Sequence, residues 1–466
     1  MSRCLHPGKL RIAFALLGIA SGSVVADGAV ARFVSSGSTT FHLVNVGADP
    51  ALAAMSLRPQ GGGEAERIEG LSVPARGVRH ELMERQAIPR RVRYAGALEG
   101  AAEVALVAQS DWASGGGVAV EGAAASEQLV VPYAVRASRV LRTLVTVQNT
   151  DPNTPASVEV TILGVGGAGE LASFHLDVAA GSSTTFEVGR APEPALADFE
   201  GALRLVGDRP IAASVFVDGL NNSLGGAGFL AVSPVDVGPR LVAPFLPIAA
   251  DSVAGRRLET LVAIQNVAAT DAAVAIELVG VTAACVGQTA TVPLEVPAGD
   301  AAHVDLSPAV TGLAEGCVAA GTIEADADSR LAATVLLAGN TTGLSAMAAY
   351  TARPDAAART ALWVPVLRRA NTEARLDTDV WLFNPGTDPA TIDVEVRDQD
   401  GGLLGCVACQ IVVPAGGGAS FSGAIGGALA EDAAGYGVII ADRPLIGVVE
   451  EAGPLDAPPT ANRDSV

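Results

Sequence analysis

Cysteine is the residue type with the clearest chemical potential in this sequence. Four of the five cysteines lie in its second half, at Cys285, Cys317, Cys406 and Cys409. A C-x-x-C pair becomes redox-active when a helix N-terminus lowers the thiol pKa, and two such pairs can hold zinc. Cys406 and Cys409 instead lie between two strand-like runs, where a two-residue hairpin turn is expected, and there is no second C-x-x-C. We therefore predict two structural disulfides, Cys285–Cys317 and Cys406–Cys409.

Histidines and acidic motifs add little further chemistry. The histidines lack metal-ligand spacing, and His80 and His303 occupy equivalent places after a turn, which indicates solvent-facing strand positions. The run from Asp398 to Gly401 resembles the start of a calcium loop but lacks the later acidic ligands, so an acidic hairpin turn is expected. Gly-rich runs lack the following helix of a phosphate-binding loop. The sequence thus predicts no catalytic, cofactor-binding or metal-binding residue.

Two further residue types concern glycans: asparagines that could carry them and aromatic residues that could bind them. Asn221 and Asn340 begin N-x-S/T sequons at equivalent loops, which indicates either glycosylation sites or a shared repeat origin. Aromatic residues make up only 4% of the chain, and a glycan-binding surface normally presents aromatic rings. Trp112, Trp363 and Trp381 fall in or beside strand patterns, so we expect them in the core.

An internal repeat organises the chain. The segments TTFHLVN, TLVTVQN, TLVAIQN and TDVWLFN each end in an asparagine that begins a turn, and they recur at intervals of roughly 105–120 residues. About 32 residues after each asparagine comes a turn of P-A-G type, and then a D-R-P-like turn precedes a further strand. The anchoring residues are Asn45, Asn149, Asn266 and Asn384, and the turn glycines are Gly77, Gly181, Gly299 and Gly416.

The local pattern within each repeat is that of β-strands. Apolar and polar residues alternate with a period of two in Thr143–Asn149 and Ser157–Leu163, as in strands with one buried face. About seven such strands per repeat suit an immunoglobulin-like sandwich. The chain therefore predicts an all-β fold of four tandem immunoglobulin-like β-sandwich modules, strung as beads or lightly packed. The expected modules are residues 27–126, 127–236, 237–358 and 359–466.

The turn motifs also resemble a known group of modules. A strand ending in N-x-G followed by a P-A-G turn, matched best by Asn384–Gly386 and Pro414–Gly416, is similar to the immunoglobulin-like tandem modules of bacterial secreted and surface proteins, such as cell-adhesion-related domains. This resemblance implies an extracellular β-sandwich repeat protein and supports the fold better than any ligand.

The N-terminus predicts export. Arg3, Lys9 and Arg11 precede the short apolar run Ile12–Ala20, and Val24–Ala26 offers a cleavage site, so residues 1–26 are expected to be a signal peptide. The formal net charge is −20, and removing this basic segment makes the chain more acidic still. Such a charge disfavours nucleic acid and anionic membrane as partners. No transmembrane segment is expected, and the predicted location is secreted, extracellular or at a bacterial cell surface.

Function is predicted in outline only. We expect a non-enzymatic structural or adhesive extracellular protein, a rod or fibre subunit whose partners are other surface proteins or further copies of itself. The alternative is a set of accessory modules that bind a glycan or protein ligand for a separate secreted enzyme; an aromatic-lined pocket would favour it. The fourth repeat lacks a closing strand after Val449. Either its acidic, proline-bearing tail protects the sheet edge, or residues 29–34 of another copy add a strand and build a fibre.

Overall fold

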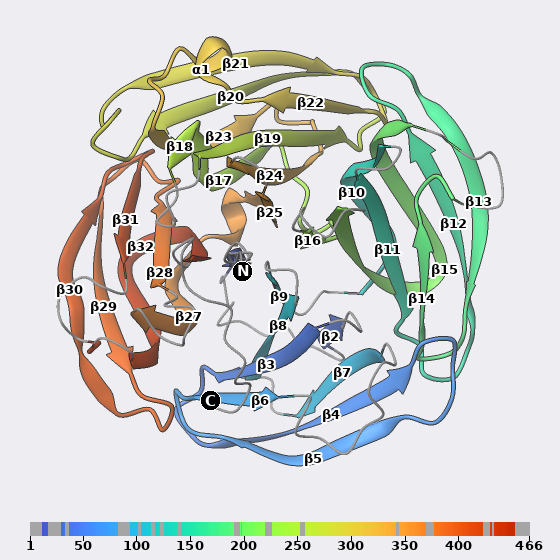
Figure 1. Ribbon diagram of the computed structural model, residues 1–466, viewed down its shortest axis with the longest axis horizontal. Helices are drawn as coiled ribbons and strands as arrows, with labels where there is room; N and C mark the ends of the chain where they lie inside the picture. Colours follow the sequence, from blue (N-terminus) through green and yellow to red (C-terminus); the bar gives the residue numbers. More distant parts are fainter. Residues whose placement is uncertain are drawn as a thin grey trace, which may run out of the picture.

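The computed structural model confirms an all-β protein and arranges its strands as a ring (Figure 1). It describes residues 12–16, 29–32, 37–82, 94–100, 104–112, 117–121, 125–137, 141–190, 196, 198–219, 226–251, 257–341, 344–369, 377–422, 429–430 and 433–452. Apart from the single turn α1 (Pro308–Thr311) and the 3-10 turn η2 (Asp355–Ala357), the described elements are strands. None of the described helices has the length and apolar character to cross a membrane.

The strands fall into four consecutive groups, which we call the first to fourth units. The first unit contains β2 (Ala29–Arg32), β3 (Gly37–Asn45), β4 (Ala51–Pro59), β5 (Glu66–Val73), β6 (Val78–Leu82), β7 (Tyr94–Gly100), β8 (Val104–Trp112) and β9 (Gly117–Glu121). The second contains β10 (Ser126–Ala137), β11 (Leu141–Asn149), β12 (Ala156–Leu163), β13 (Glu170–Val178), β14 (Ser183–Glu187), β15 (Phe199–Gly219) and β16 (Gly226–Leu230).

The third unit contains β17 (Arg240–Ile248), β18 (Ala250–Asp251), β19 (Arg257–Asn266), β20 (Ala272–Gly280), β21 (Thr289–Val296), β22 (Ala301–Asp305), β23 (Cys317–Glu324), β24 (Leu331–Thr341), β25 (Leu344–Thr351) and β26 (Arg353–Pro354). The fourth contains β27 (Arg359–Arg369), β28 (Asp377–Phe383), β29 (Ala390–Arg397), β30 (Leu403–Val413), β31 (Gly418–Ser422) and β32 (Ala433–Ala452), with β1 (Ile12–Leu16) added to it.

Each unit has two antiparallel layers with the same strand order. In the second unit one layer runs β13-β12-β15-β10 and the other β14-β11-β15-β16, so the long strand β15 belongs to both. Strand β32 does the same in the fourth unit. The apolar residues that alternate along these strands pack between the layers.

The D-R-P element was predicted as a turn, and in two units this is wrong. In β15 the residues up to Gly207 pair with β12 and those from Ile211 pair with β11, so the strand crosses between layers at Asp208–Pro210 without ending. The Asp208 carboxylate accepts a hydrogen bond from the Ser157 backbone N–H at 2.8 Å, which holds the crossing point in place. In the third unit a real turn at Asp326–Ser329 separates β23 from β24.

The units form a closed ring with shared cores, a closer arrangement than either of the two expected ones, beads on a string or light packing. Trp381 and Val448 of the fourth unit pack into the core of the third, and Ala263 and Leu336 of the third pack into that of the second. Val44, Val78 and Val107 of the first unit join the core of the fourth, which closes the circle. Shared apolar cores couple the units much more tightly than flexible linkers would.

The innermost strands also form a circle. Strands β1, β9, β16 and β25 each contact the next around the centre of the ring (Figure 1). In the first three units this innermost strand follows the other strands of its layer in the chain, so each of these units supplies its own. In the fourth it is β1, which pairs with the end of β32 from Ile12 opposite Ala452 to Leu16 opposite Val448.

The fourth unit therefore lacks its own closing strand, as the sequence indicated, and the strand that covers its edge does not come from residues 29–34, one of the two alternatives. Residues 29–32 form β2, which pairs with β7 inside the first unit. The strand beside β32 comes from residues 12–16, inside the segment predicted to be a signal peptide. The tail from 453 onward lies outside the described residues.

Candidate functional site

The four repeat asparagines are structural. Each is fully buried, and its amide donates to the backbone carbonyl of a residue four or five positions further on and to a carbonyl at the end of a later strand. Asn384 Nδ2, for example, lies 2.8 Å from the Asp388 carbonyl oxygen and 3.3 Å from that of Val413. Its side-chain oxygen accepts from Gly386 N–H at 2.9 Å. A hydrophobic replacement would leave these buried backbone groups unpaired, which explains the repeat.

The P-A-G turns lie at the contacts between units. Ser182 Oγ donates to the Pro59 carbonyl of the first unit at 2.9 Å, and Gly167 N–H of the second unit donates to the Asp300 carboxylate of the third at 2.7 Å. Tyr436 of the fourth unit donates to the carbonyl of Arg76 in the first. These landmarks therefore mark the ring interfaces and not a ligand site.

In the first repeat, the turn position was assigned to Gly77, one residue too far along the chain. Gly181, Gly299 and Gly416 have positive φ of 59°, 69° and 57°, but the equivalent residue in the first unit is Arg76, with φ of 49°. Gly77 follows it and supplies the carbonyl that accepts from Asn45 N–H.

Cys285 and Cys317 form a disulfide with their Cα atoms 5.4 Å apart. The hairpin predicted between Cys406 and Cys409 is wrong, because Leu403–Val413 is one irregular strand, β30, in which both cysteines pair with β29. The side chains of Cys406 and Cys409 lie outside the described part of the chain, so their disulfide stays a prediction.

Of the remaining candidates, the described residues place one sequon and the acidic run, and glycosylation stays a prediction. Asn221 lies outside the described residues, and Asn340 lies in strand β24 and not in the expected loop. The run from Asp398 is a hairpin turn whose Asp398 carboxylate accepts from Gly402 N–H at 2.7 Å.

The histidines after the P-A-G turns are not solvent-facing. His80 Nδ1 lies 2.6 Å from His42 Nδ1, and burial lowers the pKa of His80 to about 4, assisted by the charge of Arg368. His303 lies 2.9 Å from the Glu200 carboxylate, at the contact between the second and third units.

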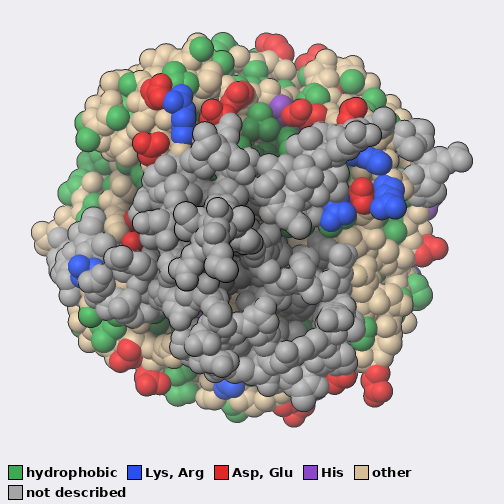
Figure 2. Space-filling model, viewed as in Figure 1, with side chains coloured by type: hydrophobic (Ala, Val, Ile, Leu, Met, Phe, Trp, Pro, Cys, Tyr) green, Lys and Arg blue, Asp and Glu red, His purple; other side chains and the backbone are tan. Residues whose placement is uncertain are grey.

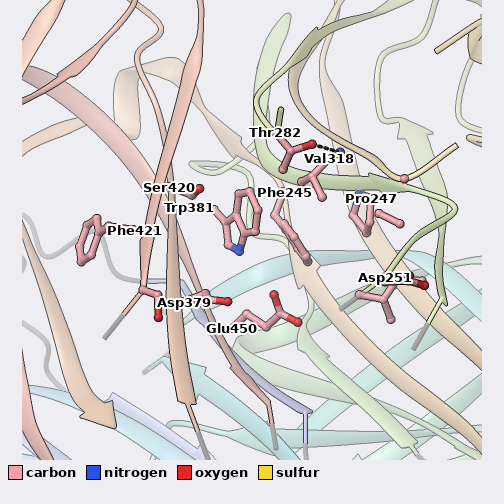
Figure 3. A pocket seen from close by; sticks show the side chains of 14 residues that line it. Phe245, Pro247, Asp251, Thr282, Val318, Asp379, Trp381, Ser420, Phe421 and Glu450 are labelled. Carbon is pink, nitrogen blue, oxygen red and sulfur yellow. Dashed lines mark hydrogen bonds between the residues drawn. The ribbon is translucent and has the colours of Figure 1, made fainter. Parts of the chain in front are cut away.

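The candidate site is a cavity of about 330 Å³ between the third and fourth units (Figure 3). The third unit contributes residues of strands β17, β18, β19 and β23 and of the loops before β21 and β23, and the fourth contributes residues of β28, β31 and β32. Three of the lining residues are acidic and none is basic. The full set of lining residues is Phe245, Pro247, Ala250, Asp251, Leu258, Thr282, Gly316, Val318, Asp379, Trp381, Ser420, Phe421, Ser422 and Glu450.

Two carboxyl groups form one wall of this cavity. Asp379 of β28 and Glu450 of β32 are directly opposite one another in the antiparallel pair, so both side chains point to the same side of the sheet. Figure 3 shows both directed into the cavity beneath Trp381. Alternation along the strands places Trp381 and Val448 on this face too, while Val380 and Val449 face the fourth unit's own core.

Burial shifts both carboxyl groups toward their neutral form. Burial raises the pKa of Glu450 to about 8, and the charge of Asp379 adds to this shift. Burial also raises the pKa of Asp379 to about 6, against a hydrogen bond from Ser422 and with a further contribution from Asp377. At neutral pH the pair therefore holds a proton that it releases when a positive charge approaches.

Polar atoms at the wall are left without partners. Glu450 is 1% exposed, yet its Oε1 and the indole nitrogen of Trp381 have no hydrogen-bond partner among the described residues. The indole N–H faces Glu450 closely enough to favour its charged form, but not at hydrogen-bonding geometry. The interaction found for these two atoms is this loose contact with each other, so both keep the capacity to bind a polar group of a ligand.

An aromatic pair lies between the carboxyl wall and the third unit. The rings of Phe245 and Trp381 lie 4.7 Å apart at an angle of 35°, one from each unit. The Cys285–Cys317 disulfide anchors the loop beside them, since Thr282 and Val318 line the cavity and Thr282 Oγ1 accepts from Val318 N–H at 3.0 Å. Together these groups can bind a ligand with a charged or polar part facing the carboxyls and an apolar part facing the rings.

Comparisons with known proteins add no assignment. No protein-family model and no curated protein matches this chain. Among solved structures, a glycoside hydrolase family 32 chain from Bifidobacterium adolescentis has 9% identity over 92% of this chain and 99% of that chain, with a TM-score of 0.15. A TM-score this low carries no argument about fold or function.

Sequence reasoning missed the carboxyl pair, although part of the signal was present. Five residues before each repeat asparagine stand Thr40, Leu144, Leu261 and Asp379. The one acidic residue at this strand position marks a departure from the repeat. Glu450 could not be found in the same way, because its register depends on the path of β32.

Proposed function

We propose that this chain is an exported, non-enzymatic binding protein whose ring of β-sheets holds a small ligand between its third and fourth units. One observation carries the proposal: the cavity combines buried, unpaired polar groups with aromatic rings. Pockets of this size with few convergent polar groups are typical of small-molecule sites. The Cys285–Cys317 disulfide and the signal-like N-terminus support export into an oxidising compartment. Cleavage after residue 26 would remove β1 and leave β32 without it.

We assign the lining carboxyls, Asp379 and Glu450, to holding charge. They are lining groups that could exchange a proton, and no histidine or lysine stands beside the hydroxyl groups of Ser420, Ser422 and Thr282 among the described lining residues. The aromatic lining was also the feature expected for a binding module and not for a purely structural rod.

Fluorine NMR tests this function. The chain has three tryptophans, so protein labelled with 5-fluorotryptophan gives few signals, and Trp381→Phe identifies the one in the cavity. We expect the Trp381 signal to shift with at least one member of a panel of sugars, carboxylates and organic cations, with the ligand recovered unchanged. Trp363, which stacks on Tyr436 in the fourth unit, is the internal control. If no member moves the Trp381 signal, the proposed function is wrong.

An adhesive or structural role is the second candidate, because one sheet edge is apolar. Strand β30 is the outer strand of its layer, and Leu403, Leu404 and Val412 on it are exposed. Such an edge is suited to pairing with another chain. Light scattering at high concentration, with Val412→Lys as the disrupting variant, tests this role: an adhesive protein should assemble, and the variant should not.

A further inference from the structure

The ring interfaces provide a reference for the carboxyl pair. At the position of Asp379 and Glu450, the second unit has Leu144 opposite Phe216 and the third has Leu261 opposite Leu336. An apolar pair therefore serves at this register in two other units. The fourth unit instead places two carboxyl groups side by side, away from water.

Charge in and around the cavity has one sign. Besides Asp379 and Glu450, Asp251 lines the opposite side and Asp377 lies on the same strand as Asp379. Arg257, next in the chain to the lining residue Leu258, pairs with Glu315, and Arg368 pairs with Glu451, next in the chain to Glu450. The surface around the ring is also rich in acidic side chains (Figure 2). This field attracts cations to the site and repels anions.

The aromatic pair of Phe245 and Trp381 suits the same kind of ligand. The faces of Trp and Phe rings carry negative potential and attract cations within about 6 Å, most strongly where water is excluded. An ammonium group near Glu450, whether or not it carries an N–H, would also give Oε1 an electrostatic partner of opposite charge. A neutral ligand would leave the carboxyl pair to keep its proton, whereas a cation can take the place of that proton.

We propose that the cavity binds a free small organic cation, with its ammonium group held between the Asp379–Glu450 carboxyl pair and the rings of Trp381 and Phe245. This inference rests on the proposed binding function and names its ligand class. The cation displaces the proton held by the carboxyl pair, and that proton leaves to solvent. Binding is therefore weak at low pH and strengthens as the pH rises through 8.

Calorimetry with two matched compounds tests the proposal. Choline carries a trimethylammonium group, and 3,3-dimethylbutan-1-ol has the same shape without the charge. At pH 8.5 we expect choline to bind at least about tenfold more tightly than the alcohol, and at least about tenfold more tightly than choline itself binds at pH 5.5. Glu450→Gln and Trp381→Leu should each weaken choline binding about tenfold or more. The exposed Asp393→Asn in the same unit should not change it.

The outcomes separate this inference from the proposed function. Equal binding of choline and the alcohol overturns the cation assignment but leaves a small-molecule site. The same holds if neither binds while another member of the fluorine NMR panel moves the Trp381 signal. If no compound moves that signal, the binding function fails as well. Thermal unfolding of Glu450→Gln shows whether the variant is folded, and Trp381→Leu provides the independent test if it is not.

Discussion

Two interfaces of the ring use the same strand positions with opposite chemistry. Between the second and third units, Leu261 and Leu336 face each other and pack against the second unit's core. Between the third and fourth units, Asp379 and Glu450 occupy those positions beside a cavity. The comparison teaches that closing the ring does not require carboxyl groups at this register.

The interface between the third and fourth units, which we call the carboxyl interface, costs more folding free energy than the apolar interface between the second and third units. Removing a carboxylate from water without a full set of hydrogen bonds costs several kcal/mol, whereas burying a leucine is favourable. If stability alone decided these positions, an apolar pair would serve better. We infer that the carboxyl pair is retained for binding.

Placing a carboxyl group at the apolar interface between the second and third units should give the largest loss of stability. Leu336→Glu places a carboxyl in the second unit's core, where Leu336 is 4% exposed and no polar partner is arranged for it. We expect a loss of about 4 kcal/mol or more in the free energy of unfolding at pH 8, measured with denaturant. Leu336→Met is the matched control and should cost less than about 1.5 kcal/mol. A loss for Leu336→Glu as small as that of the control would show that the two interfaces do not differ.

The pH dependence of stability should also distinguish the interfaces. The pKa of Glu450 is raised to about 8 in the folded chain, so between about pH 4.5 and 8 the folded state binds more protons than the unfolded state. Stability therefore falls as the pH rises through this window and levels off above it. We expect Glu450 to account for a loss of roughly 3 kcal/mol between pH 5 and 8.5.

Glu450→Gln isolates this contribution, because the neutral amide does not titrate. Its unfolding free energy should depend less on pH than that of the wild type, and it should be the more stable protein at pH 8.5. Parallel pH profiles for the two proteins would mean that Glu450 titrates as an ordinary exposed carboxyl.

The disulfide fixes the third unit's side of the carboxyl interface. Replacing Cys285 and Cys317 by alanine should lower the free energy of unfolding by about 2–4 kcal/mol, because the bond joins cysteines 32 positions apart. The second unit's equivalent hairpin is held without cysteines through Gly167 and Asp300. Denaturation of wild type with and without reductant should reproduce the difference, and an unchanged midpoint would contradict it.

The smallest expected effect is a local change in hydrogen exchange beside β1, the strand that residues 12–16 add to the fourth unit. Deleting residues 1–26 removes β1, which pairs with Val448–Ala452 of β32. Backbone amides in this stretch that face β1 should then exchange hydrogen at least about tenfold faster. The innermost strand of the second unit, β16, is part of its own unit and is the internal control. Unchanged exchange at 448–452 would show that β1 does not cover this edge in solution.

The sequence predicted the strands well and the ring not at all. Period-two alternation and turn residues are local signals, so Ser157–Leu163 and the Cys285–Cys317 pair were within reach. Closure depends on contacts far apart in the chain, such as Tyr436 with Arg76, and no local pattern records them. Of the site, Asp379 was visible as a departure from the repeat, but Glu450 and Phe245 join it only through strand register and packing between units.

The double variant Asp379→Leu with Glu450→Leu tests the central claim most directly, because it gives the carboxyl interface the residues of the apolar one. Denaturation at pH 8.5 and choline calorimetry are measured on the same protein. The account predicts an unfolding free energy within about 1 kcal/mol of the wild type, or higher, together with loss of choline binding. A loss of several kcal/mol, or choline binding that survives the exchange, would contradict it.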